Sequence, residues 1–463
     1  MDKKELVSAQ AAVDKVSEKA QSFIDGIVDE ASFVETDAFV VGAREGALGE
    51  GVVTGYATIE GTPVHIFAQN ADVMLGSIGA ASAKKIAKCM KRACATGTPL
   101  ISVLDCSGAR LDEGAAVMEA YASLLALAAE VAETVPHICI VKGVAVGMTA
   151  TFAAMADYVY MSKDAVMSVN SPMYLASKLT AVPKLNKMVG YDAYKETSAL
   201  ASDTYSSLKD LKGKLVDLLA TVGIVEKEGV DDDPNRVMSA LTKKYSVKGA
   251  LEALTDGGKY IEINADYAKD VVCAYAKVNG ISVAIVAQDS GENDGYMSED
   301  GVKKAAGFIN KANAFGLPLI SLVDSKGFNP DLKQELSGFA CKTACLFKAV
   351  ASYEHPMIAV ACGNAVGAAY SALMSKGIGF DYTLATTDAK VAPVTADTGV
   401  HVFYTEELKQ GKTAKSMKAL EKKFNDDMAN PLTAAGEGYI DNVIEAGNIR
   451  PCVSSALLML LGI

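Results

Sequence analysis

The 463-residue sequence contains no tryptophan and only four histidines, and it has no segment typical of a secretion signal. Met1 to Val16 alternates charged with small residues, whereas a signal peptide needs a central apolar region. We also find no apolar run of the length that crosses a bilayer. These absences, with a hydrophobic fraction of 50% and 39 glycines, predict a soluble globular protein with closely packed layers of helices and strands.

The nine cysteines are odd in number and mostly lie inside apolar segments, which is unlike a disulfide framework and favours a reducing, cytoplasmic location. Cys341 and Cys345 have the spacing of neighbours on a helix, but no second Cys or His pair is close to them in the sequence. We therefore expect buried thiols in a core helix, and no metal site.

Positive charge is also scarce, since the formal net charge is −12. Nucleic-acid binding needs clustered Lys and Arg to neutralise phosphates, so we do not expect a nucleic-acid partner. The basic run Lys84 to Arg92 has helical spacing, and a solvated helix face is a simpler explanation for it than contact with ligand phosphates. Ser107 lacks the Gly-x-Ser-x-Gly surroundings of a serine hydrolase nucleophile.

What the sequence does contain is an internal repeat. Gly61 to Asp105 aligns without a gap on Gly280 to Asp324, at an offset of 219 residues. The match resumes at an offset of 220, where Ala145-Val146-Gly147 corresponds to Ala365-Val366-Gly367. A period above 200 residues indicates a duplicated domain rather than a solenoid.

The charged, proline-containing segment Lys227 to Arg236 separates the two copies. It predicts an N-terminal domain of residues 1–232 and a C-terminal domain of residues 233–463. The hydrophobic pattern predicts strand, strand, helix, strand in each copy, and hence an α/β fold with two duplicated domains. The expected elements are a helix in the first 35 residues, a strand at Phe39–Val41, then Gly51–Ile59, Val64–Ala68, Ala80–Thr96 and Leu100–Leu104, and in the second copy Tyr260–Val271, Val278–Gln288, Asp300–Phe315 and Leu319–Val323.

Glycine-bearing turns follow the buried strands. Ser107 to Arg110 and Gly147-Met148 do so in the first copy, and Lys326 to Phe328 and Gly367 to Ala369 in the second. Small residues let a substrate oxygen approach the backbone, and two N–H groups directed at one oxygen form an oxyanion hole. For any one such turn, close packing of helix on strand is the better explanation, but four turns at corresponding places favour a functional role.

At these residues the sequence resembles a known family. Phe67 to Asn70, Gly76 to Gly79, Asp105 to Gly114 and Gly438 to Ile444 look like the carboxyltransferase subunits of biotin-dependent acyl-CoA carboxylases and of the sodium-pumping acyl-CoA decarboxylases. The resemblance covers nearly the whole chain and implies two crotonase-like domains, each a superhelix of ββα units. It also implies an active site between the N-terminal half of one subunit and the C-terminal half of another, usually in a hexamer.

The family's chemistry explains why no catalytic His, Cys or carboxylate stands out. The resemblance implies that the N-terminal half binds the acyl-CoA and the C-terminal half binds biotin, with CO2 passing between two enolates that backbone N–H groups stabilise. It places Gly108, Ala109, Gly147 and Met148 at the thioester oxygen, Ala368 and Ala369 at the ureido oxygen of biotin, and Ser107, Arg110, Gly327, Phe328 and Gly367 in the surrounding binding sites. For Arg110, an ion pair with Asp112 or Glu113 is the alternative to a phosphate contact.

The turns depart from the family pattern at several positions. Where the family usually has two adjacent glycines, this chain has Ser107-Gly108, Gly147-Met148 and Gly367-Ala368. Lys326 and Asp331 replace a proline and a glycine of another turn. Alanine and serine still offer an N–H, but the bulky side chain of Met148 is able to narrow the acyl-CoA pocket.

The sequence has no biotin-accepting Ala-Met-Lys-Met, no Gly-rich ATP-binding loop and no four-cysteine zinc ribbon; Ser416 to Ala419 shares only two letters with the biotin motif. The resemblance therefore implies that biotin arrives on a separate carrier protein, in company with a biotin carboxylase or a membrane decarboxylase subunit. The expected activity moves a carboxyl group between an acyl-CoA, of the malonyl/acetyl or methylmalonyl/propionyl type, and that biotin. Two alternatives stay open: a catalytically silent structural or regulatory subunit, and a biotin-independent crotonase-like enzyme acting on CoA thioesters.

Overall fold

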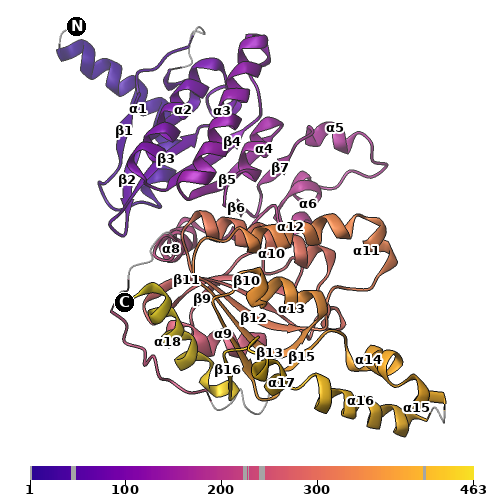
Figure 1. The fold of residues 1–463 in the computed structure, drawn as a ribbon. Coiled ribbons are helices and arrows are strands. Elements are labelled where there is room, and N and C mark those ends of the chain that lie inside the picture. The colour runs from indigo at the N-terminus through magenta and orange to yellow at the C-terminus, as the bar shows by residue number, and fades with distance from the viewer. Residues whose placement is uncertain (1–2, 43–47, 223–226, 228, 239–245, 410–412) are drawn as a thin grey trace. The chain divides into compact units, whose positions relative to one another are not determined.

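The computed structural model describes residues 3–42, 48–222, 227, 229–238, 246–409 and 413–463. The chain divides into two compact units, Met1–Ala220 and Thr221–Ile463, here called unit 1 and unit 2. Unit 1 is coloured indigo to magenta in Figure 1, and unit 2 continues to yellow. The division falls before residue 232 because Asp232 and Arg236 are tied into unit 2: Asp232 pairs with Arg236 and Arg450, and Arg236 donates to Thr255 O at 3.1 Å. Glu228, in the expected linker, lies outside the described residues.

Unit 1 is built on one eight-stranded sheet with the order β1-β2-β3-β4-β5-β6-β8, in which β7 pairs with β5. The β1–β2 and β2–β3 pairs are antiparallel and the pairs from β3 onward are parallel. Its strands are β1 (Val34–Thr36), β2 (Val52–Ile59), β3 (Thr62–Gln69), β4 (Leu100–Cys106), β5 (His137–Val146), β6 (Tyr158–Ser162), β7 (Val166–Ser168) and β8 (Asp203–Tyr205); its helices are α1 (Lys3–Asp25), α2 (Ala80–Thr96), α3 (Ala115–Thr134), α4 (Met148–Ala154), α5 (Pro172–Ala176), α6 (Leu185–Val189), α7 (Tyr191–Tyr194) and α8 (Leu208–Leu219).

Unit 2 repeats this sheet in the order β16-β14-β13-β12-β11-β10-β9, with β15 beside β13. The α/β class and its duplication are therefore confirmed. Its strands are β9 (Tyr260–Glu262), β10 (Val271–Val278), β11 (Ile281–Gln288), β12 (Leu319–Ser325), β13 (Met357–Val366), β14 (Tyr382–Thr386), β15 (Lys390–Ala392) and β16 (Asn442–Ile444); its helices are α9 (Val247–Leu254), α10 (Glu299–Ala314), α11 (Leu332–Leu336), α12 (Phe339–Ala351), α13 (Gly367–Leu373), α14 (Ala396–Phe403), α15 (Thr405–Lys409), α16 (Ala414–Met428), α17 (Pro431–Gly436) and α18 (Ile449–Leu461).

Two of the expected strands are wrong. The run expected at Tyr260–Val271 contains only the short β9, because Asn264 and Ala268 have positive φ angles of 54° and 46° that interrupt an extended chain. Phe39–Val41 is not a strand either: β1 lies earlier in the chain, and Val41 forms only an isolated bridge with Leu48.

Helix α3 packs beside α2 in the core of unit 1 (Figure 1). By length and a mean hydropathy of 1.5 it is apolar enough to cross a membrane, contrary to the expectation that no run reaches that length. Burial gives the physical reason for its apolar composition, because one face of the helix lies in the unit 1 core. The buried residues of this face are Val117, Tyr121, Leu124, Leu127, Ala128 and Val131.

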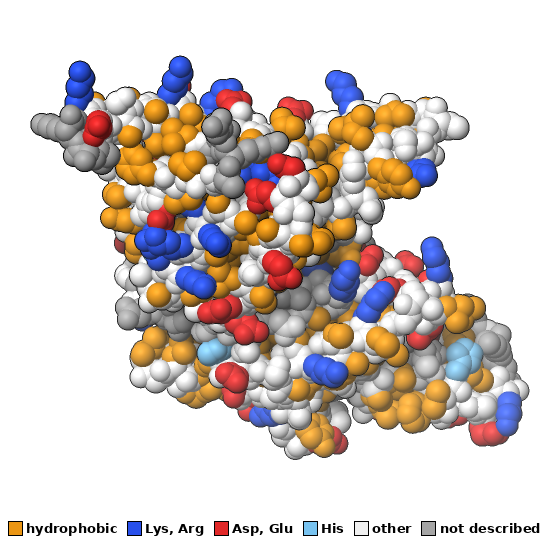
Figure 2. Space-filling view, turned by 90° about the horizontal axis from the view of Figure 1, so that it is seen from above, with side chains coloured by type: hydrophobic (Ala, Val, Ile, Leu, Met, Phe, Trp, Pro, Cys, Tyr) orange, Lys and Arg blue, Asp and Glu red, His pale blue; other side chains and the backbone are white. Residues whose placement is uncertain are grey.

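The expectation of buried thiols at Cys341 and Cys345 is also wrong. Helix α12 buries Phe339, Leu346 and Val350. These positions share one face of the helix, so the two cysteines fall on the other face and are exposed. Figure 2 shows the surface of one side of the molecule, where acidic and basic side chains are interspersed among apolar ones.

Candidate active site

In unit 1 the two glycine turns meet at one edge of the sheet. Strands β4 and β5 are parallel neighbours with Cys106 opposite Ala145, so the segments that follow them leave the sheet side by side. A β-carbon on Gly108 would lie 3.6 Å from the carbonyl oxygen of Val146, which places the turns in van der Waals contact. Gly108 and Gly147 have φ angles of 107° and 66°, which favour glycine.

Each turn presents a backbone N–H group. Ile78 N–H donates to Gly108 O at 2.9 Å, and Arg110 N–H donates to Ile78 O at 2.9 Å. Between these two bonds, the Ala109 N–H has no hydrogen-bond acceptor within the described part of the chain. Met148 begins α4, so its N–H has no partner within the helix. The sequence predictions for Gly108, Ala109, Gly147 and Met148 are thus brought together at one place in unit 1.

Unit 2 reproduces the arrangement. Ser325 lies opposite Ala365 on β12 and β13, and a β-carbon on Gly327 would lie 3.7 Å from Val366 O. Met297 replaces Ile78: its N–H donates to Gly327 O at 2.9 Å. The Phe328 N–H then corresponds to that of Ala109, and again has no acceptor among the described residues.

The second turn of unit 2 carries the residues expected at the biotin oxygen. Gly367, with a φ of 58°, begins α13 and is followed by exposed Ala368. Ala369 is fully buried, so of the two alanines only Ala368 lies at the surface. The Ala368 N–H belongs to the first turn of the helix and has no intrahelical partner.

Beside these turns unit 2 has a cavity of about 300 Å³. Lys326 lines it, and its ammonium group donates to Asp294 O at 2.8 Å and lies 5.7 Å from the centre of the Tyr296 ring. The other lining residues are Tyr296, Asn364, Val366, Lys390, Ala392, Val394, Thr395, Ala396, Asp397, Glu421, Phe424, Asn425 and Ala429. Asp331, the other departure from the family turn, caps α11 by accepting the N–H groups of Lys333 and Gln334 at 3.3 Å each.

An aspartate carboxylate, half-buried in unit 1 and buried in unit 2, holds each pair of turns from behind. Asp105 accepts the Val144 N–H at 3.2 Å, and its own N–H donates to Gln69 Oε1 at 3.2 Å. A β-carbon on Gly143 would lie 2.3 Å from Asp105 Oδ1, so only glycine leaves room for the carboxylate.

The corresponding residues of unit 2 do the same. Asp324 accepts the Asn364 N–H at 2.7 Å, its N–H donates to Gln288 Oε1 at 3.2 Å, and Gly363 leaves the same space. Reasoning from the sequence missed this role, although the identity of Gln, Asp and Gly in both copies was the signal that could have found it.

Lys85, within the basic run, is neither solvated nor available to a phosphate. It is 2% exposed and donates to Val52 O at 2.6 Å and Gly49 O at 3.3 Å, and burial lowers its pKa. Lys304 repeats this role in unit 2, where it donates to Val271 O and Tyr267 O at 2.8 Å each. Both lysines hold backbone carbonyls at the start of a strand.

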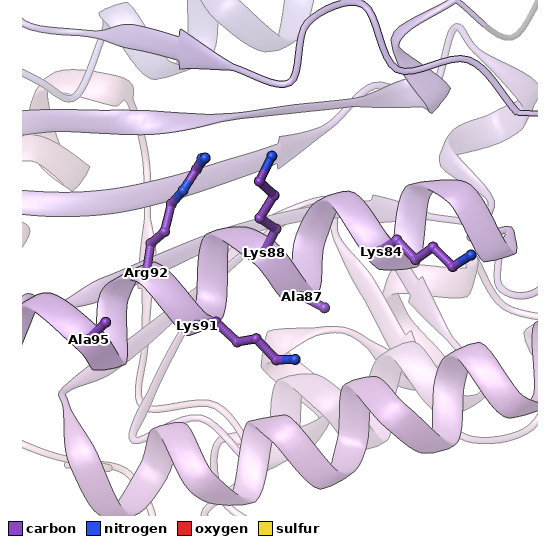
Figure 3. A pocket seen from close by; sticks show the side chains of 6 residues that line it. All are labelled: Lys84, Ala87, Lys88, Lys91, Arg92 and Ala95. Atoms are coloured by element: carbon purple, nitrogen blue, oxygen red, sulfur yellow. The ribbon is translucent and has the colours of Figure 1, made fainter.

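The rest of the basic run lines a hollow of about 400 Å³ on the surface of α2, shown in Figure 3. Lys88 and Arg92 point to one side of the helix, where they pair with Asp37 at 2.5 and 3.4 Å. Lys84 and Lys91 point to the other side. This arrangement fits the expected solvated face.

Arg110 is buried, and its guanidinium binds other residues of unit 1. It is 3% exposed, its guanidinium pairs with buried Glu50, and it donates to Glu50 O at 3.2 Å and Ser77 O at 3.1 Å. Of the alternatives weighed from the sequence, the ion pair with Glu113 is present at 3.4 Å, while Glu50 was missed because it is 60 residues away in the chain. We therefore leave Arg110 out of the ligand site proposed below. Exposed Ser107 remains beside Gly108.

Comparison with known proteins agrees with this architecture. The family model described as "Carboxyl transferase domain" matches residues 16–461. The methylmalonyl-CoA carboxyltransferase 12S subunit of Propionibacterium freudenreichii subsp. shermanii is 29% identical over 95% of this chain and 88% of its own length. The propionyl-CoA carboxylase beta chain of Saccharopolyspora erythraea is 30% identical over 95% and 87%. The methylmalonyl-CoA decarboxylase subunit alpha of Propionigenium modestum is 28% identical over 94% and 89%.

A solved structure extends the match to three dimensions. The transcarboxylase 12S crystal structure, a hexamer assembly with methylmalonyl-coenzyme A and methylmalonic acid bound, superimposes with a TM-score of 0.91 at 26% identity, over 99% of this chain and 95% of that one. The family model and these relatives place the chain among the enzymes that transfer carboxyl groups. This chain belongs to the carboxyl transferase domain family, as its sequence predicted.

Proposed function

We propose that this chain moves a carboxyl group between an acyl-CoA of the methylmalonyl/propionyl type and biotin on a separate carrier protein. The observation that carries the proposal is the pair of touching turns in each unit, each pair with two backbone N–H groups for which the described residues provide no acceptor. The substrate type follows the relatives, whose names specify methylmalonyl-CoA and propionyl-CoA.

In unit 1, Ala109 and Met148 would donate to the thioester oxygen and stabilise the enolate that forms when the α-proton leaves. A donor of this kind contributes about 3 kcal/mol to the transition state in well-studied enzymes. Gly108 and Gly147 allow the close approach, and Asp105 fixes the second turn through Val144.

In unit 2, Phe328 and Ala368 are the corresponding donors for the ureido oxygen of biotin, and Gly327 and Gly367 leave space for its ring. The adjoining cavity of about 300 Å³ is at the lower end of the size of small-molecule sites, and its polar residues fit a ureido group. Bound biotin would supply the carboxyl group and accept the proton. The chain's own contribution is to hold the two reactants and donate hydrogen bonds.

The proposed assembly is a homo-oligomer, a hexamer like that of the transcarboxylase 12S structure, which works in the cytoplasm with a biotinyl carrier protein. A biotin carboxylase or a membrane decarboxylase subunit would complete the complex. The direction of net carboxyl flow then depends on that partner.

The direct test supplies purified protein with methylmalonyl-CoA labelled in its free carboxyl group, together with a biotinylated carrier domain. We expect label to move to the carrier, and none to move when the carrier lacks biotin. Binding of acetyl-, propionyl-, malonyl- and methylmalonyl-CoA, measured by calorimetry, ranks the substrates. Conversion of a CoA thioester without biotin would instead favour the crotonase-like alternative.

A substitution at Met148 distinguishes an active from a silent subunit. Its side chain is 36% exposed beside the unit 1 turns, where it is able to narrow the thioester site. If it narrows the thioester site, Met148→Gly will bind propionyl-CoA about tenfold more tightly than the wild type, a gain of roughly 1.4 kcal/mol. Met118→Gly, at an exposed methionine of α3, serves as the control for loss of helix stability. If instead the wild type binds propionyl-CoA and Met148→Gly weakens that binding, the methionine forms part of a working site.

A further inference from the structure

Beneath the unit 1 turns lies a buried polar cluster that the reaction does not use directly. Cys106, the last residue of β4, is fully buried, and its sulfur accepts the Gly108 N–H at 3.3 Å and lies 3.5 Å from Gly108 O. The thiol therefore contacts both polar atoms of the glycine that precedes Ala109. This side chain adds to the backbone hydrogen bonds with Ile78 that hold the first turn.

The same sulfur is linked to the second turn. Cys106 Sγ lies 3.3 Å from Thr149 Oγ1, and Thr149 directly follows Met148 in α4. Tyr121 of α3 closes the cluster: its hydroxyl lies 2.8 Å from Thr149 Oγ1 and 3.8 Å from Cys106 Sγ. Thr149 and Tyr121 are each 1% exposed, so water does not compete for these contacts. Burial raises the pKa of Tyr121, so its hydroxyl keeps its proton and can donate.

Unit 2 shows that the fold does not require this link. There Ser325 replaces Cys106 and still contacts both atoms of Gly327, accepting its N–H at 3.2 Å and donating to its carbonyl at 3.0 Å. Ala369 stands where Thr149 would be, and it has no hydroxyl to reach the serine. Both units form the same sheet and the same turns, and in both an aspartate holds the turns, but among the described residues the additional thiol–hydroxyl link is present in unit 1 and has no counterpart at Ala369 of unit 2.

We propose that Cys106, Thr149 and Tyr121 are positioning residues that set the spacing of the Ala109 and Met148 N–H groups in unit 1. This inference rests on the proposed function, in which those two groups act on one oxygen. A displacement of about 1 Å in a reacting geometry can lower a rate on the order of 100-fold. Side chains that fix the spacing of the two N–H groups can therefore have a large effect on the rate of carboxyl transfer. The thioester enolate, which exists only during the reaction, needs this spacing more than the bound substrate does.

The test compares Thr149→Val, which keeps the shape but removes the hydroxyl, with Thr149→Ser, which restores it. Tyr121→Phe removes the partner hydroxyl, and Tyr160→Phe removes the hydroxyl of a buried β6 tyrosine outside the cluster as the matched control. We expect Thr149→Val and Tyr121→Phe to lower kcat for carboxyl transfer by about 10- to 100-fold with little change in the Kd for the CoA thioester. Thr149→Ser and Tyr160→Phe should stay close to the wild type.

Hydrogen exchange measured by mass spectrometry gives a readout that does not depend on activity. Thr149→Val should exchange faster than the wild type in residues 107–114 and 147–155, with α2 unchanged. An unchanged kcat in an active enzyme overturns the inference, and so does an equal loss in Tyr160→Phe, which would indicate a general effect of buried hydroxyls. If the wild type transfers no carboxyl group, the proposed function fails. In that case the positioning role is judged from hydrogen exchange alone, and unchanged exchange of these two segments in Thr149→Val overturns it.

Discussion

At Gly143 and Gly363 the duplicated site has no room for a side chain. Each lies against an aspartate carboxylate that holds a turn, and a β-carbon would come within 2.3 Å of Asp105 Oδ1 or 2.2 Å of Asp324 Oδ1. Real contacts of this kind are never so short, so the carboxylate must move and give up its hydrogen bond to the next N–H. The requirement at these positions is for space and not for a left-handed φ.

We predict that Gly143→Ala lowers the free energy of unfolding by about 1–3 kcal/mol, since overpacking a tight site costs that much. Gly213→Ala is the matched control, because Gly213 is exposed in α8 and a β-carbon there meets nothing within 4 Å. It should stabilise the protein by roughly 0.5–1 kcal/mol through helix propensity. Urea denaturation measures the free energy of unfolding of both variants. Equal values for the two would contradict the steric argument.

The residue scale is also where prediction from sequence was weakest. Lys85 looked like a member of a solvated run, because a helical pattern does not reveal that one lysine of the run faces the sheet. Arg110 has a partner, Glu50, that is distant in sequence. The glycine turns were found because their function depends on local backbone conformation, which the residue types themselves record.

At the scale of elements, an aspartate fixes the β2–β3 hairpin. Asp29 accepts the N–H groups of Glu60 and Gly61 at 2.9 Å each and the hydroxyl of Thr58 at 2.7 Å. These bonds, that of Gly61 first, lower the pKa of Asp29 to about 2. Unit 2 repeats the device: Asp256 accepts the N–H groups of Asn279 and Gly280 at 2.9 and 2.8 Å.

We predict that Asp29→Asn lowers the free energy of unfolding near pH 7 by about 1–2 kcal/mol, through loss of hydrogen bonds to a charged acceptor. The folded pKa lies below the unfolded value of about 3.9, so the stabilisation is complete above that pH and is lost as the pH falls toward about 2. The difference between wild type and variant should therefore shrink as the pH falls from about 4 toward about 2 in urea titrations. Asp25→Asn, at an exposed position that ends α1, is the control for removal of a surface carboxylate.

Element boundaries were predictable where the repeat constrains them. Helix α2 has the bounds read from the sequence, and β10, β11 and β12 are β2, β3 and β4 displaced by 219 residues. Applying that offset to Val52–Ile59 gives β10 directly, whereas the hydrophobic pattern alone predicted a strand at Tyr260–Val271, which ends where β10 begins. A duplicated sequence therefore carries information on each element twice, and the clearer copy corrects the other.

At the scale of the whole molecule, each unit has its own sheet and its own pair of turns. The proposed function assigns the acyl-CoA to the turns of unit 1 and biotin to those of unit 2. The family resemblance implies that a working site joins unit 1 of one copy to unit 2 of another. Such a shared site makes activity a property of the assembly, and it can be tested by mixing two inactive variants.

Gly147→Val should inactivate unit 1 and Gly367→Val unit 2, because each forces a β-branched residue to a φ near 60°. When the two variants are unfolded, mixed in equal amounts and reassembled, half of the pairs contain one copy of each. A mixed pair with shared sites has one site with both defects and one with neither, so about a quarter of wild-type carboxyl transfer should return. Each variant reassembled alone must remain inactive while it keeps the wild-type oligomer size on gel filtration. If the mixture also stays inactive, both units of one site come from the same chain, and the proposed site between copies is wrong.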